Sequence, residues 1–174
     1  MMIAEQDVLT EREPTVAAGR DKRGEPFVIR AYSPARLDAL QAFYEEFEPK
    51  RRAQGLPPAG HERIRGWLAS VLSKGIHLLV FREEDLIGHG LVMPTTRDGV
   101  GEYAVFLRES QRSRGIGTEL TRAVVSTARQ VGLRGLWLSV EPGNKAAIRS
   151  YEKAGFRFVP STILSIEPEM ELAL

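Results

Sequence analysis

The sequence predicts a mixed α/β domain, and three stretches support that prediction. Residues 103–107 are an apolar, β-branched and aromatic run, and beyond a glycine loop the apolar residues from Ile116 onward recur at helical spacing. Residues 136–140 are nearly all apolar, which is typical of a strand buried on both faces and parallel to a neighbour. Residues 76–82 and 86–93, joined by an acidic turn, are expected to form an antiparallel hairpin.

The first strand of the folded domain is expected at residues 27–30. Residues 1–25 mix charges with little periodicity, so we expect a flexible arm, with an additional edge strand or a cover for a partner subunit as the alternatives. Ser33 and Pro34 are suited to the N-cap and first position of a helix. Its apolar face is formed by Leu37, Leu40, Phe43, Tyr44 and Phe47.

Residues 49–58 have no periodicity and are expected to form a loop. A second helix is predicted at about residues 61–73, ended by Gly75, before the hairpin and a turn at 94–99. The long helix after the glycine loop should end near Gly132. Asn144 can cap a helix over 145–154 that Gly155 closes, and residues 156–159 and 169–174 should be the last strands.

The composition suits one globular domain, expected over residues 26–174 of the 174. The net charge of +1 argues against a protein that binds mainly by neutralising nucleic-acid phosphates. The chain has no cysteine, so it has no disulfide, thiolate metal site or cysteine nucleophile. No apolar run approaches the roughly 20 residues of a membrane helix, and no signal-peptide pattern is present. We therefore expect a cytoplasmic protein that does not bind a membrane.

The glycine loop is the first candidate site. Gly115 and Gly117 stand where a strand turns into a helix, and the first N–H groups of a helix attract phosphate. The loop lacks the third glycine of a dinucleotide fingerprint and the Gly-Lys-Ser/Thr ending of a P-loop. A tight turn without a ligand is the simpler alternative.

Two motifs resemble those of the GCN5-related N-acetyltransferase (GNAT) superfamily. Arg112-Ser113-Arg114-Gly115-Ile116-Gly117 resembles its Arg/Gln-x-x-Gly-x-Gly/Ala signature. Residues 144–156 resemble its Asn-x-x-Ala-x-x-x-Tyr-x-x-x-Gly-Phe signature, in the same order along the chain. The resemblance covers Phe27 to the C-terminus. It departs from the usual pattern at Leu107, Glu109 and Ser113, where valine, proline and glycine are frequent.

The resemblance implies a mixed sheet of six or seven strands with helices on both faces. Its fourth and fifth strands splay apart, so that the pantetheine arm of acetyl-CoA can pair with the free strand edge. It implies acetyl-CoA as donor substrate and no metal. The residues expected to bind it are Val105, Phe106, Leu107, Arg112, Ser113, Arg114, Gly115, Ile116, Gly117, Thr118, Asn144, Ala147 and Tyr151.

The implied reaction is N-acetylation by direct attack in a ternary complex. A primary amine must lose its proton before it attacks a thioester, and a proton stabilises the departing thiolate. Tyr151 is the candidate acid, with a buried aromatic as the alternative. Glu102 is the candidate base, because its strand resembles that of bacterial protein-lysine acetyltransferases, with a solvated strand-end glutamate as the alternative.

Several alternatives stay open. The acceptor can be a protein lysine or a small-molecule amine, the donor can be another acyl-CoA, and a homodimer is compatible with the sequence. The chain could also be a non-catalytic acyl-CoA sensor, or a phosphate- or nucleic-acid-binding module that uses Arg112, Arg114 and the basic cluster at 50–52. His61, His77 and His89 have no metal-ligand spacing, so no metal site is expected.

Overall fold

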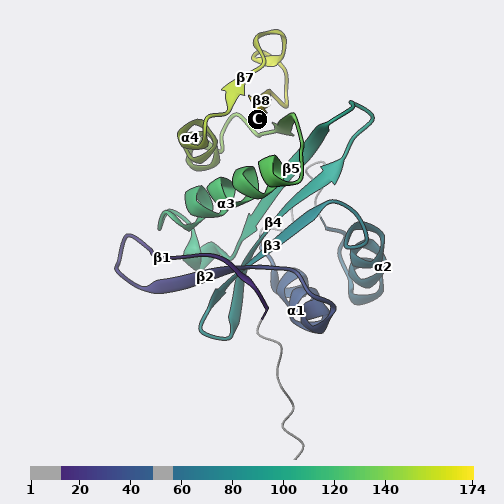
Figure 1. Cartoon of the computed structure of the whole chain (residues 1–174), viewed down its shortest axis with the longest axis vertical. Coiled ribbons are helices and arrows are strands. Elements are labelled where there is room, and N and C mark those ends of the chain that lie inside the picture. The colour runs from purple at the N-terminus through teal and green to yellow at the C-terminus, as the bar shows by residue number, and fades with distance from the viewer. Residues whose placement is uncertain (1–12, 49–56) are drawn as a thin grey trace, which may run out of the picture.

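The computed structural model describes residues 13–48 and 57–174, and these form one mixed sheet of eight strands in the order β1-β2-β3-β4-β5-β6-β8-β7 (Figure 1). The strands are β1 (Thr15–Arg20), β2 (Pro26–Ala31), β3 (Ile76–Arg82), β4 (Asp85–Pro94), β5 (Val100–Leu107), β6 (Gly135–Ser139), β7 (Arg157–Phe158) and β8 (Glu169–Ala173). The α-helices are α1 (Leu37–Glu46), α2 (His61–Val71), α3 (Ile116–Gln130) and α4 (Lys145–Ala154). The predicted mixed α/β fold is confirmed.

The strand pairing also agrees with the sequence pattern. β3 and β4 form the expected antiparallel hairpin, and β6, the nearly all-apolar strand, pairs with β5 in parallel. The other neighbours in the sheet are antiparallel. The basic cluster at 50–52, considered for phosphate binding, lies outside the described residues. Within the described part of the chain, no helix is long and apolar enough to cross a membrane.

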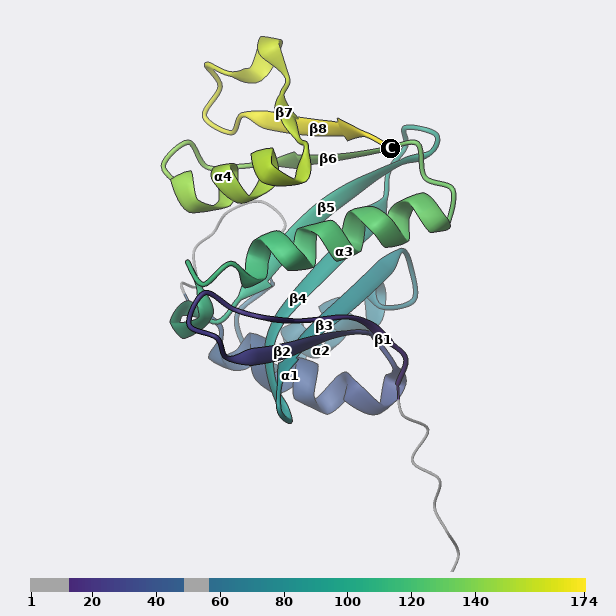
Figure 2. The same cartoon turned by 60° about the vertical axis from the view of Figure 1, so that its left-hand side comes forward.

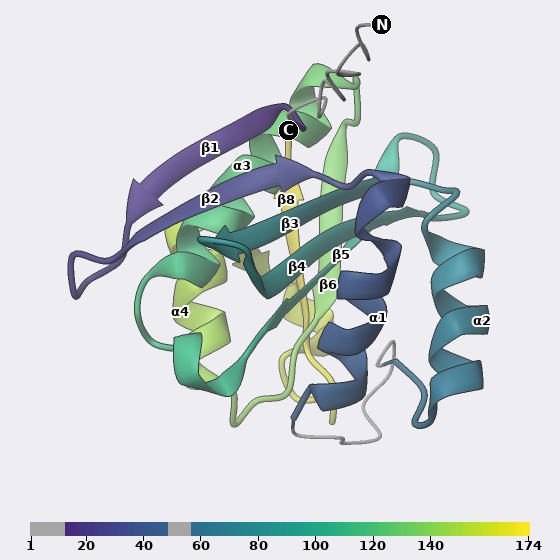
Figure 3. The ribbon, with the colours of Figure 1, turned by 90° about the horizontal axis from the view of Figure 1, so that it is seen from below.

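Helices cover both faces of the sheet, with α1 and α2 on one side and α3 and α4 on the other (Figure 3). The alternation of side chains along β3 shows how one strand serves both layers. Leu78 and Val80 pack in the cluster under α3, whereas Leu79 and Phe81 pack in the cluster under α1 and α2. Each fully buried leucine or phenylalanine contributes about 1.5–3 kcal/mol to stability, so the sheet is held from both sides.

β1 corrects the expectation of a flexible arm over residues 1–25. Thr15–Arg20 form an edge strand antiparallel to β2, which was the alternative, and this strand brings the sheet from the expected six or seven strands to eight (Figure 2). Residues 1–12 lie outside the described residues. An edge strand is held mainly by backbone pairing and needs little apolar surface. The few apolar residues of this segment therefore did not predict a strand.

A side chain of the N-terminal segment also changes the expected helix cap. Glu13 accepts hydrogen bonds from the Ser33 hydroxyl and from Arg36 Nε, the latter at 2.9 Å. Ser33 stands at the predicted N-cap before Pro34, but its side chain makes no capping hydrogen bond. The chain there begins a short 3-10 helix that continues into α1. The hydroxyl instead links Glu13, which precedes β1, to the start of this helix.

A buried polar chain links α1, β4 and β3. His77 Nε2 lies 2.7 Å from the carbonyl oxygen of Lys74, so this nitrogen carries the proton of a neutral ring. His77 Nδ1 then accepts from His89 Nε2 at 3.1 Å, and His89 Nδ1 accepts from the Tyr44 hydroxyl at 2.6 Å. Within the described ranges, no group of three His, Cys, Asp or Glu side chains is placed to hold a metal ion.

This chain predicts acid-sensitive stability. Burial lowers the pKa of His77 and of His89 below the ordinary 6.5, and the neighbouring His77 lowers that of His89 further. Below pH 6.5 the two histidines take up protons in the unfolded chain but not in the folded chain. They therefore leave the free energy of unfolding unchanged above pH 6.5 and lower it progressively as the pH decreases below 6.5. The fall is at most about 1.4 kcal/mol per pH unit for each histidine. Urea unfolding measured from pH 7.5 downward tests this.

A pair of variants separates titration from packing. His89→Gln removes one titrating group and should make the loss of stability below pH 6.5 shallower. Ile64→Val, in the core cluster that contains the His89 partner Tyr44, should lower stability by about 0.5–1.5 kcal/mol at every pH and leave the slope unchanged. If the free energy of unfolding depended on pH equally in wild type and His89→Gln, the acid sensitivity could not be assigned to His89.

Candidate active site

An opening at the predicted site residues lies where β5 and β6 part. The two strands pair only at Val100, Gly101 and Glu102 of β5, and beyond Glu102 they diverge (Figure 2). A cleft of about 980 Å³ lies there, lined by β5, by residues 112–115, by the first turns of α3 and by α4. The β6-facing backbone groups of residues 103–107 are therefore outside the ladder. The resemblance implied such a splay between the fourth and fifth strands, which are β5 and β6 here because β1 is an additional strand.

The glycine loop closes one end of the cleft. Gly115 is the N-cap of α3 and has a φ of 91°, a left-handed conformation that glycine adopts without a Cβ clash. A Cβ on Gly117 would lie 3.2 Å from Leu107 Cδ1, so the first turn of α3 sits tightly against β5. The first N–H groups of a helix have no partner inside it, and those of α3 lie at the cleft wall. Ser113 has a φ of 59°, which is the reason that glycine suits this position in the similar motif.

The second motif positions α4 beside this loop. Asn144 caps α4 as predicted, because its Oδ1 accepts from the backbone N–H of Ala147 at 3.2 Å. Thr118 of α3 and Ser150 of α4 share a hydrogen bond of 2.9 Å between their hydroxyl oxygens. Gly155 ends α4 in the left-handed conformation with a φ of 104°. These contacts hold the two helices together on one side of the cleft.

Tyr151 lines the cleft from α4. Its ring meets that of Tyr103 edge-on, with centroids 6.0 Å apart, and it also contacts Phe156. Burial raises the pKa of Tyr151 above the ordinary 10, so the hydroxyl keeps its proton at physiological pH. The ring of Tyr151 belongs to the core, and the residue also lines the cleft.

Glu102 lines the cleft from the opposite face of the sheet. Neighbouring strand residues point to opposite faces. Tyr103 packs with α3 and α4, so Glu102 points with Phe106 toward the side of α1 and α2. Glu102 is exposed and stands at the last paired position before β5 and β6 part. A carboxylate and a phenol thus approach one opening from its two sides.

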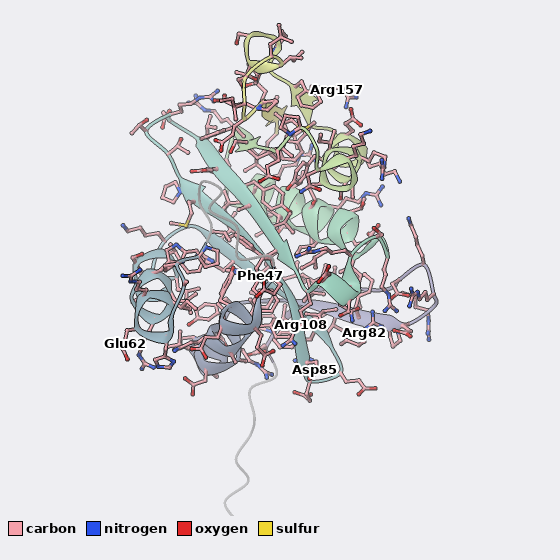
Figure 4. The ribbon with its side chains drawn as sticks, turned by 180° about the vertical axis from the view of Figure 1, so that it is seen from behind. Phe47, Glu62, Arg82, Asp85, Arg108 and Arg157 are labelled. Atoms are coloured by element: carbon pink, nitrogen blue, oxygen red, sulfur yellow. The ribbon has the colours of Figure 1, made fainter. Side chains whose placement is uncertain are left out.

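The two arginines of the loop are engaged within the protein. Arg112 donates from Nε to the carbonyl oxygen of Leu107 at 3.1 Å and lies over the Phe47 ring, 5.6 Å from its centroid. Figure 4 shows Phe47 at the end of α1 beside the sheet. Arg114 is buried and pairs with Asp21, 2.6 Å from its carboxylate, and with Glu25. The sequence suggested that both arginines add charge to a phosphate site, but the charge of Arg114 is already balanced.

Most of the residues singled out from the sequence meet at this one cleft. The exception is Ile116, whose side chain is fully buried in the core under α3, although its backbone belongs to the loop. The lining residues among those predicted are Glu102, Val105, Phe106, Leu107, Arg112, Ser113, Arg114, Gly115, Gly117, Thr118, Asn144, Ala147 and Tyr151. The lining residues that sequence reasoning missed include Arg20, Asp21, Lys22, Phe47 and Arg149. Neither motif specifies these five, although Arg149 stands at a variable position of the second one, and Phe47 belongs to a periodic apolar face.

Comparison with known proteins identifies the family of this chain. The family model described as "Acetyltransferase (GNAT) family" matches residues 38–156. An L-methionine sulfoximine/L-methionine sulfone acetyltransferase of Pseudomonas aeruginosa is 36% identical over 58 residues, which are 33% of this chain and 34% of that protein. A mycothiol acetyltransferase of Corynebacterium glutamicum is 32% identical over 87 residues, 50% of this chain and 30% of that protein. The matched segments thus span about a third of these curated relatives.

Solved structures share the fold over most of this chain. The GNAT domain of S. lividans PAT superposes with a TM-score of 0.75 at 18% identity, over 91% of this chain and 96% of that one. The structure of yncA from Salmonella typhimurium with acetyl-CoA superposes with a TM-score of 0.69 at 18% identity, over 85% of this chain and 94% of that one. At this level of identity the likeness shows the shared fold.

Proposed function

Because the chain belongs to the acetyltransferase (GNAT) family, we propose that it transfers an acetyl group from acetyl-CoA to a primary amine bound at the same time. The observation that carries this proposal is the parting of β5 and β6 beyond Glu102, which opens a cleft between a free strand edge and the N-terminus of α3. A free strand edge suits the amide groups of pantetheine, and the helix N-terminus suits its diphosphate. Acetyl-CoA supplies the thioester that an amine can attack.

Glu102 and Tyr151 reach the cleft from opposite faces of the sheet, and we assign them different roles in the reaction. Glu102, on the side of α1 and α2, takes the proton that the ammonium must lose, directly or through water. Tyr151, on the side of α4, donates a hydrogen bond to the sulfur as it gains charge. The amine would enter from the side of α1 and α2, where Phe47 and Phe106 line the cleft. The loop from Ser113 to Gly117 holds the diphosphate.

The direct test is release of CoA from acetyl-CoA against a panel of small-molecule amines, protein lysines and peptide N-termini. The curated relatives carry small-molecule names, L-methionine sulfoximine, L-methionine sulfone and mycothiol, and this supports testing a small-molecule amine first. Calorimetric binding of CoA is measured in parallel. Binding without turnover on any acceptor would favour a non-catalytic acyl-CoA sensor, and absence of both would overturn the proposal.

Glu102→Gln tests the base. Without the carboxylate the amine must lose its proton unaided, so the pH needed for half-maximal kcat/KM should move upward toward the amine's own pKa, about 10.4 for a lysine side chain. Glu171→Gln is the matched control, because Glu171 on β8 and Glu102 on β5 both pair with Trp137 of β6, and Glu171 does not line the cleft. A pH profile of Glu102→Gln that matches wild type would remove Glu102 from the mechanism.

A further inference from the structure

The turn of the β1–β2 hairpin lies against the glycine loop (Figure 2). The backbone N–H of Lys22 donates to the carbonyl oxygen of Arg114 at 2.9 Å, and Arg20, Asp21 and Lys22 all line the cleft. This hairpin precedes the segment, 38–156, that matches the family model. A part of the chain outside that match therefore forms one wall of the candidate coenzyme site.

A cluster of four charged residues, here called the latch, joins the hairpin to the loop. It consists of Asp21, Glu25, Arg82 and Arg114. Asp21 has a fully buried carboxylate whose Oδ2 lies 2.7 Å from Arg82 and 2.6 Å from Arg114. Glu25 pairs with the same two arginines. Figure 4 shows Arg82 beside the hairpin. Burial alone would raise the pKa of Asp21, but hydrogen bonds from the backbone N–H groups of Arg23 and Glu25 and from Arg82 lower it to about 2. Asp21 is thus ionised at physiological pH.

The charges of the latch cancel, since it contains two carboxylates and two guanidinium groups. Arg114 therefore brings no net charge to the cleft, although it stands in the loop motif. Its Nε is buried without a hydrogen-bond partner among the described residues, and the residue lines the cleft. A positive side-chain charge for a diphosphate then has to come from the other basic residues that line the cleft, which are Arg20, Lys22, Arg112, Arg122, Arg149 and Lys153.

Lys22 is placed to supply it. At Gly115, the N-cap of α3, an added Cβ would lie 3.6 Å from Lys22 Cγ and 3.8 Å from Lys22 Cε, so the lysine crosses the start of the helix. Its ammonium makes no ion pair or hydrogen bond with any other described residue. An ammonium beside the positive end of a helix dipole is unfavourable unless an anion lies between them. We propose that Lys22 binds the diphosphate of CoA from the hairpin side, held there by the latch.

This inference rests on the proposed function, and the test uses the full chain and CoA itself. Lys22→Met keeps the aliphatic stem and removes the charge. Arg23→Met is the matched control, because Arg23 is the next residue of the same turn, loses the same charge and does not line the cleft. By calorimetry at low salt, Lys22→Met should weaken CoA binding about ten-fold, the effect of one partly exposed charge-assisted hydrogen bond. Arg23→Met should change it less than about two-fold.

Two further measurements assign the contact. The ten-fold loss should persist with dephospho-CoA, which keeps the diphosphate and lacks the 3′-phosphate; disappearance of the loss would overturn the diphosphate assignment. Thermal unfolding of Lys22→Met without ligand should match wild type, because the side chain is exposed. Wild-type binding of CoA together with unchanged binding by Lys22→Met would overturn this inference alone. A wild-type chain that binds no CoA would overturn the proposed function as well.

Discussion

Tyr151→Phe should lower kcat by about 10²–10⁴-fold, the range typical of lost general acid–base catalysis, with little change in acetyl-CoA affinity. The change removes only the hydroxyl and leaves the ring packed on Tyr103 and Phe156. Burial raises the pKa of Tyr151, so the hydroxyl is always available as a donor. Complete transfer to a thiolate, whose thiol has a pKa of about 8.5, is uphill. Part of the effect is therefore a hydrogen bond to the developing negative charge.

Tyr103→Phe is the control for this prediction. Tyr103 also lines the cleft, but its hydroxyl is 2.9 Å from Thr121 Oγ1 of α3 in the buried core. Its loss should cost about 0.5–1.5 kcal/mol of stability, the net contribution of one hydrogen bond, because Thr121 Oγ1 still donates to the Gly117 carbonyl oxygen at 2.7 Å. The change should leave kcat within a few fold. Steady-state kinetics with the acceptor found in the panel, and urea unfolding, compare the two variants. A fully active Tyr151→Phe protein would assign the residue to the core alone.

Gly117→Asp should weaken acetyl-CoA by several kcal/mol, on the scale of burying an anion beside another. The first turn of α3 forms the cleft wall, so the new carboxylate would stand where the diphosphate is expected. It would also crowd Leu107, whose Cδ1 would be 3.2 Å from the added Cβ. Titration calorimetry measures the affinity directly. An unchanged affinity would remove the diphosphate from this loop.

Gly117→Ala separates charge from crowding in that experiment. The added methyl group faces the end of a flexible leucine side chain and, at 3.8 Å, Ser150 Oγ. Alanine in a helix is favoured over glycine by up to about 1 kcal/mol. The alanine variant should therefore fold normally and lose much less affinity than the aspartate variant. Equal losses would mean that the loop tolerates no side chain and that charge is not the cause.

Helix caps, helix ends and hairpin turns depend on residues close in the sequence. The sequence by itself therefore predicted these local features, which include the hairpin of β3 and β4, the Asn144 cap and the Gly155 stop. The strand β6 was predicted from its own apolar run, although its parallel pairing with β5 is a long-range contact. The two motifs that flank α3 and β6 likewise placed Gly115, Gly117 and Tyr151 before the fold was known. Their meeting at one cleft follows once β5 and β6 pair only at their first residues.

Long-range pairing decided what the sequence could not. β1 has a weak apolar pattern and is held by backbone pairing with β2 and by Glu13, so its presence depends on the edge of a finished sheet. The charge of Arg114 looked free for a phosphate, but tertiary packing buries it against Asp21 and leaves Lys22 facing the cleft. A motif specifies which residue types are present near a site. Which of their charges remain available depends on partners brought from distant segments, because burial and pairing are properties of the folded state.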